Sequence, residues 1–99
     1  MKYPHVEAYI RRLAEIPWAN KKGPSAQMAA HLQKMLNEKG VQAVVGYAHA
    51  MRHDSDRLAN GAFTQIVNIC ALANLDRHGK IDPFIPSDLT RLAREVAGL

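Results

Sequence analysis

The sequence predicts an all-α protein, folded as a compact bundle of four or five helices with a long apolar helix at its centre. Apolar residues recur at three- and four-residue steps along most of the chain, and residues 58–75 carry no charge. Residues that close helices stand at Gly40, Gly79 and Gly98. With 99 residues, 47% hydrophobic and 22% charged, the chain has the size and composition of a single helical domain, 1–99.

The first helix is expected between Pro4, which suits a first turn, and Pro17, which ends it. Its apolar residues gather on one helical face: Val6, Tyr9, Ile10, Leu13 and Ile16. Arg11, Arg12 and Glu15 fall largely on the other side. The helix is therefore amphipathic and lies on the surface of the core.

Residues 18–24 are expected to form a loop, which holds the only tryptophan and the pair Lys21 and Lys22. Ser25 is expected to cap the second helix, and Gly40 to close it. The apolar face of this helix consists of Met28, Leu32, Met35 and Leu36.

Residues 41–52 are the ambiguous segment, because Val44, Val45 and Tyr47 also suit a strand. A helix would place five apolar residues on one face, namely Val41, Val44, Val45, Ala48 and Met51. Strict alternation would mix apolar and polar residues on both faces of a strand. Helix is the prediction, and strand is the alternative.

The capping residues Asp54, Ser55 and Asp56 are expected to precede the long central helix. Apolar residues cover more than half of its circumference, which is typical of the centre of a bundle or of a subunit interface. The core is expected around Phe63, Ile66, Val67, Ile69 and Cys70. A narrow polar stripe also runs along this helix and consists of Asn60, Thr64 and Asn68.

After Gly79, residues 81–86 are expected to form an extended connection whose Phe84 and Ile85 hold it to the core. Ser87 is expected to cap the last helix. Its inward-facing residues are Leu89, Leu92, Ala93 and Val96.

Composition indicates a cytoplasmic protein. Cys70 is the only cysteine, so no internal disulfide can form, and the start of the chain lacks a secretory pattern. The polar residues within 58–75 argue against a membrane span. No cofactor is expected, and an enzyme is the least supported class, because phosphate loops, nucleophile elbows and paired carboxylates are absent.

One histidine pair has the spacing of a metal site. His49 and His53 are four residues apart, and Asp54 or Asp56 would add an oxygen ligand. Ala50 stands where zinc proteases carry their general base, so that activity is excluded. Surface histidines beside a helix end are the expectation, and a metal-dependent site is an outside alternative.

A second stretch resembles the calcium-binding loop of EF-hand proteins over about twelve residues. The matching residues are Asn74, Asp76, His78, Gly79, Ile81 and Asp82. The resemblance ends at Ile85, where that family has a bidentate glutamate. A helix end followed by a turn is the expected structure.

The positive charge is uneven. Residues 1–40 hold seven Lys and Arg against three Glu, whereas residues 41–99 hold six of each sign, so the first part carries the net charge of +4. Such asymmetry is compatible with an anionic partner and also with an ordinary solvated surface.

The expected function is that of a small non-enzymatic binding or regulatory protein that acts through protein–protein contacts, including self-association as a homodimer. Trp18 beside Pro17 is the expected anchor of such a contact. The alternative is a nucleic-acid-binding protein whose basic N-terminal part contacts phosphates through Arg11, Arg12, Lys21 and Lys22. A helix-turn-helix is not expected, because the segment after Gly40 is poor in base-reading side chains.

Overall fold

The observed fold is all-helical, which confirms the predicted fold class. The computed structural model describes residues 2–80 and 87–99, and these contain no strand. The elements are α1 (Pro4–Glu15), α2 (Pro24–Lys39), α3 (Val41–His53), the 3₁₀ turn η1 (Ser55–Arg57), α4 (Asn60–His78) and α5 (Asp88–Ala97). The ambiguous segment 41–52 is thus helical, as its periodicity predicts. The predicted connection 81–86, with Phe84 and Ile85, lies outside the described residues.

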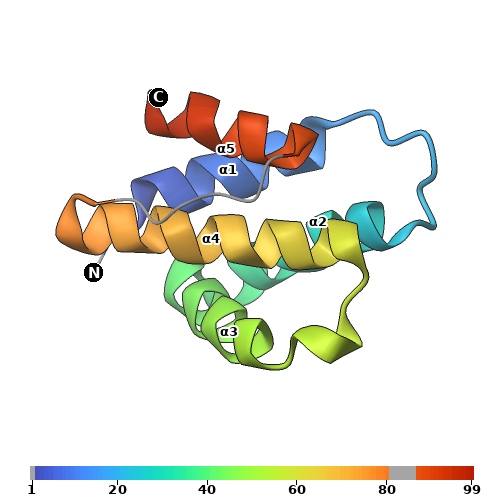
Figure 1. Ribbon diagram of the computed structural model, residues 1–99, viewed down its shortest axis with the longest axis horizontal. Helices are drawn as coiled ribbons and strands as arrows, with labels where there is room; N and C mark the ends of the chain where they lie inside the picture. The colour runs from blue at the N-terminus through green and yellow to red at the C-terminus, as the bar shows by residue number, and fades with distance from the viewer. Residues whose placement is uncertain (1, 81–86) are drawn as a thin grey trace.

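Helix α4 occupies the centre of the bundle and contacts α1, α2, α3 and α5. Figure 1 shows α1 and α5 above α4, α3 below it and α2 behind it. All residues from 64 to 73 of α4 are buried. Its predicted central position is therefore confirmed. None of the helices in the described part of the chain is long and apolar enough to cross a membrane.

Within the described residues, the core contains side chains from α1 to α5, including Tyr9, Leu32, Val44, Ile69 and Ala93. Of the residues predicted at its centre, Ile66, Val67, Ile69 and Cys70 are all at most 6% exposed. The prediction that Phe63 lies at the centre of the core is wrong, because its side chain is only half-buried and does not belong to the buried cluster. It lies in the first turn of α4, toward the end of the bundle, rather than in the middle of the helix.

Local signals correctly mark most helix ends. Gly40, Gly79 and Gly98 all have a positive φ and follow α2, α4 and α5 directly. Ser87 caps α5, because its hydroxyl accepts a hydrogen bond of 3.1 Å from the Thr90 amide.

Two predicted caps are wrong. Helix α2 begins at Pro24, and Gly23 rather than Ser25 is its N-cap. A proline is favoured there because its missing N–H would have no partner in a first turn. Residues 54–56 do not cap α4 either. Asp54 precedes η1, and Ser55 and Asp56 belong to it. Helix α4 begins later, at Asn60, with Ala59 as its N-cap.

A buried polar network joins α1, α4 and α5. The Asn68 side-chain amide donates to the Tyr9 hydroxyl over 2.9 Å, and the Thr90 hydroxyl donates to the Asn68 carbonyl oxygen over 3.3 Å. The Tyr9 hydroxyl in turn donates to the Leu89 backbone carbonyl. Burial raises the pKa of Tyr9. One member of the predicted polar stripe is thus an internal link between three helices.

The start of α1 is capped by a residue from the far end of α4. The Asp76 carboxylate, 1% exposed, accepts hydrogen bonds from the His5 amide at 3.1 Å and the Val6 amide at 3.3 Å. It also contacts the His5 ring. An anion there satisfies amides that a helix start leaves without partners, so α1 and α4 stabilise one another.

Candidate functional site

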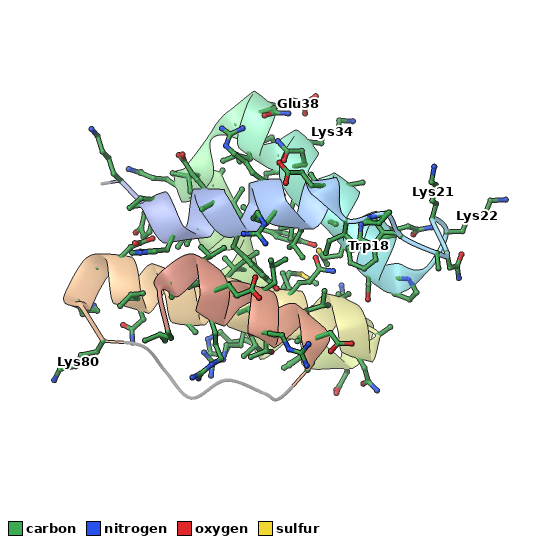
Figure 2. The ribbon with its side chains drawn as sticks, turned by 90° about the horizontal axis from the view of Figure 1, so that it is seen from above. Trp18, Lys21, Lys22, Lys34, Glu38 and Lys80 are labelled. Carbon is green, nitrogen blue, oxygen red and sulfur yellow. The ribbon has the colours of Figure 1, made fainter. Side chains whose placement is uncertain are left out.

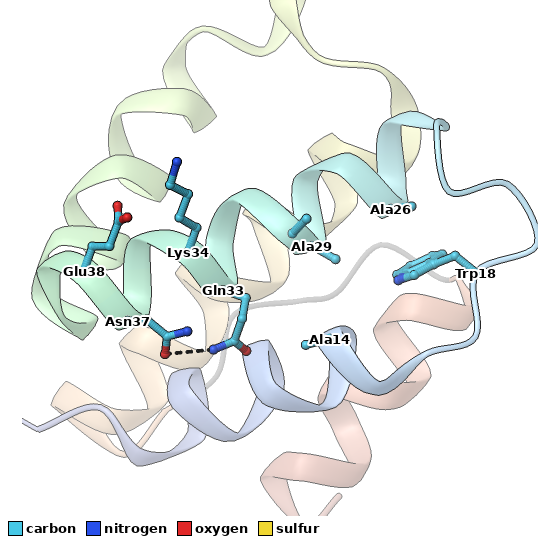
Figure 3. A pocket seen from close by; sticks show the side chains of 9 residues that line it. Ala14, Trp18, Ala26, Ala29, Gln33, Lys34, Asn37 and Glu38 are labelled. Carbon is cyan, nitrogen blue, oxygen red and sulfur yellow. Dashed lines mark hydrogen bonds between the residues drawn. The ribbon is translucent and has the colours of Figure 1, made fainter.

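A groove of about 490 Å³ lies between α1 and α2, and Figure 3 shows the side chains that line it. Its lining consists of Ala14, Trp18, Ala26, Ala29, Ala30, Gln33, Lys34, Asn37 and Glu38. Four of these nine residues are alanines. Their small side chains leave open the space that larger residues would fill between the two helices.

Helical spacing places these residues in a row. On α2, positions 26, 29, 30, 33, 34, 37 and 38 follow the three- and four-residue steps that bring residues to one side of a helix. Ala29 is fully buried and Ala26 is 7% exposed, whereas Ala30 is exposed. The groove therefore has a buried apolar floor and an accessible edge.

Trp18 stands at one end of the groove. Its backbone N–H donates to the Ile16 carbonyl over 2.9 Å, which tightens the turn that follows α1. The half-buried Trp18 side chain packs against the hydrophobic core, and Figure 3 shows its ring beside the Ala26 end of α2. An aromatic side chain held in this way offers apolar area at little entropic cost.

The other end of the groove is polar. The Gln33 amide donates to the Asn37 side-chain oxygen over 3.1 Å. Lys34 and Glu38 are exposed, and both belong to the lining. The groove thus changes from an aromatic and alanine-lined end to one with amide groups and both charge signs.

The two neighbouring arginines of α1 are both exposed, and one of them pairs with α5. Arg11 is exposed on α1. The Arg12 guanidinium lies 3.4 Å from the Glu95 carboxylate of α5, and the two side chains are 49% and 55% exposed. Arg12 therefore faces α5, whereas Trp18 faces α2.

The two predicted lysines lie near the tryptophan end of the groove. Figure 2 shows Lys21 and Lys22 extending outward from the same end of the molecule as Trp18. Both are exposed. Lys22 also lines a second hollow of about 410 Å³, together with His31 and Arg57.

This second hollow lies where the starts of α2 and α4 meet. A Cβ atom placed on Gly61 would lie 1.8 Å from the Ser25 hydroxyl, so the two helices approach closely there. Neither helix has an acidic residue in its first turn, and neither has a side-chain cap. The His31 ring is packed edge-on against Tyr47, with ring centroids 5.2 Å apart.

The proposed metal ligands do not come together. Within residues 2–80 and 87–99, no three His, Cys, Asp or Glu side chains are placed to hold a metal ion, so His49, His53 and Asp56 form no such group. His49 lines a small hollow between α3 and α4 instead. The second half of the EF-hand-like stretch, with Asp82 and Ile85, lies outside the described residues.

Comparison with protein-family models, curated proteins and solved structures gave no match to this chain. The geometry of the groove is therefore the basis of the functional assignment. Sequence reasoning identified Trp18 but missed the alanines and amides beside it. Their signal in the sequence is weak, because alanine at helical spacing is equally typical of close helix packing.

Proposed function

We propose that this protein is a non-enzymatic binding protein that receives a short segment of a partner protein in the groove between α1 and α2. The observation that carries this proposal is the half-buried Trp18 ring at the end of an alanine-lined groove. Aromatic residues in such positions commonly dominate the energetics of protein interfaces.

The size of the groove suits one or two large apolar side chains of the partner. Its volume of about 490 Å³ is within the usual range of ligand pockets, about 300–1,000 Å³. Stable interfaces bury about 1,600 Å² in total, so a segment that fills only this groove would form a transient complex.

The charge around the groove favours an acidic segment. Residues 1–40, which include both groove-forming helices, carry the whole net charge of +4. Lys21 and Lys22 lie near the Trp18 end, whereas Glu38 accompanies Lys34 at the other end. The partner's acidic residues are therefore expected near Trp18, beside the apolar side chain that enters the groove.

Selection from a library of short random peptides tests this proposal. The expected consensus pairs a large apolar residue with neighbouring Asp or Glu. Trp18 is the only tryptophan, so its fluorescence reports directly whether a selected peptide enters the groove. Trp18→Ala should weaken binding by at least about 1 kcal/mol, or roughly fivefold.

A matched pair of variants separates groove binding from general effects. Ala30 is exposed at the groove, whereas Ala50 is exposed on α3. Ala30→Arg should block the selected peptides and Ala50→Arg should not, while both should melt at similar temperatures. Equal binding by the two variants would contradict the proposal.

Nucleic-acid binding is the second candidate, and the hollow lined by Lys22, His31 and Arg57 favours it. Two uncapped helix starts beside cationic side chains suit a phosphate group. In that case Lys21→Ala with Lys22→Ala should weaken binding to mixed-sequence DNA or RNA. The log–log salt slope should fall by roughly 0.7–0.9 for each phosphate that the protein no longer neutralises. The same double change should lower the affinity for acidic groove-binding peptides less than Trp18→Ala does, because exposed charge pairs at the rim of an interface contribute little.

A further inference from the structure

A small hollow of about 110 Å³ lies between α3 and α4. It shares no lining residue with the groove between α1 and α2 or with the second hollow. It is lined by His49, Arg52, Cys70, Asn74 and Arg77. The first two residues are three apart on α3, and the other three are spaced by four and three on α4. These spacings bring each set to one helical face, so the two faces meet at the hollow.

Two exposed arginine side chains line this hollow, and its lining includes no carboxylate. In the described part of the chain, the ion pairs of arginine involve Arg12, Arg57 and Arg91. Arg52 and Arg77 have no carboxylate within 4 Å among those residues. Two cations facing one hollow repel each other, and a bound anion would remove that repulsion.

The acids that are nearest in sequence are engaged elsewhere. Asp76 precedes Arg77, but its carboxylate is buried against the first amides of α1. Asp54 follows closely on Arg52, but it pairs with Arg57 at 3.1 Å. Neither carboxylate is therefore available to neutralise the charge of Arg52 and Arg77 at the hollow.

Both arginines lie in the last turns of their helices, where a cation is favourable. An arginine in the last turn of a helix stabilises that helix end even when its side chain extends into solvent. The position in the last turn therefore does not explain why Arg52 and Arg77 line the same hollow. A guanidinium also offers paired N–H donors that match a phosphate group, which a lysine does not.

We infer that this hollow is a binding site for a phosphate group, inorganic or in a small monoester, held by Arg52 and Arg77 with His49 at its edge. The volume of about 110 Å³ holds a group the size of a few water molecules, which suits a phosphate group. The remainder of a monoester would lie outside, in solvent. This inference does not depend on the groove between α1 and α2.

The test uses the whole protein with sodium phosphate, O-phosphoserine and sodium chloride at equal ionic strength. Phosphate or O-phosphoserine should raise the melting temperature relative to chloride. Amide NMR shifts should change mainly in residues 49–52 and 70–77. Response to both phosphates identifies the phosphoryl group as the ligand, whereas response to inorganic phosphate alone identifies the free anion.

Arg52→Gln and Arg77→Gln should each weaken binding by roughly three- to tenfold, which is less than a buried charge-assisted contact would give, because both side chains are exposed. The double variant should show no phosphate-specific response. Arg11→Gln is the matched control, because Arg11 is an exposed arginine on a different helix and also has no carboxylate partner in the described residues. Unchanged binding in the double variant, or equal losses in the control, would overturn the inference. The NMR shifts decide the matter even if a variant is unstable.

Discussion

The capping of α1 by Asp76 makes the start of that helix depend on a residue about 70 positions away. Asp76→Ala removes the acceptor of the His5 and Val6 amides. A lost N-cap costs about 0.5–2 kcal/mol. A partly buried charge at a helix end contributes up to about 2 kcal/mol more. The expected loss is roughly 1–4 kcal/mol, which is a substantial part of the 5–15 kcal/mol typical of such domains.

Urea unfolding followed by circular dichroism measures this loss. Asp76→Asn keeps the volume and one acceptor oxygen, so it should lose about half as much as Asp76→Ala. Asp56→Asn is the control, because Asp56 is exposed and should change stability by less than about 0.5 kcal/mol. If Asp76→Ala unfolds at the same urea concentration as the control, the carboxylate does not stabilise α1 and the reasoning is wrong.

Two further predictions concern packing and pH. Gly61→Ala should destabilise the protein, because the added Cβ atom would meet the Ser25 hydroxyl, and Ser25→Ala should restore part of the lost stability. Gly46→Ala should instead stabilise the protein by up to about 1 kcal/mol, because a Cβ atom at Gly46 would meet nothing within 4 Å. Chemical unfolding measures both changes, and the same sign for the two alanines would contradict this account. Because burial raises the pKa of Tyr9, stability should be complete below about pH 10 and decline above it, as the unfolded tyrosine ionises first. Tyr9→Phe should make that alkaline decline shallower, and an unchanged slope between about pH 10 and 11 would show that Tyr9 is not its source.

The features that the sequence determined by itself depend on residues close to one another along the chain. Gly40 and Gly79 close their helices and Ser87 caps α5, because each acts on backbone groups within a few positions. Periodicity likewise identified residues 41–52 as helix. It also identified α4 as the centre, since an uncharged helix with so wide an apolar surface must be covered on most sides.

Where neighbouring residues could play the same local role, tertiary contacts decided between them. Ser25 has the side chain of a cap, yet α2 begins one residue earlier, at Pro24. The Ser25 carbonyl accepts a hydrogen bond of 2.7 Å from Gln65, and Gly61 packs against its side chain. These contacts come from α4, and no pattern around residue 25 reveals them.

The candidate site shows the same division. Trp18 was recognisable as the only tryptophan of the chain, but the groove beside it exists only because α1 and α2 pack with alanines between them. The surface to which Arg12 belongs is set by Glu95, which lies beside it although it is 83 residues away in the sequence. Helical periodicity determines which residues share a face. Which faces meet depends on the packing of the whole core, and that decides which side chains become a groove, a cap or an ion pair.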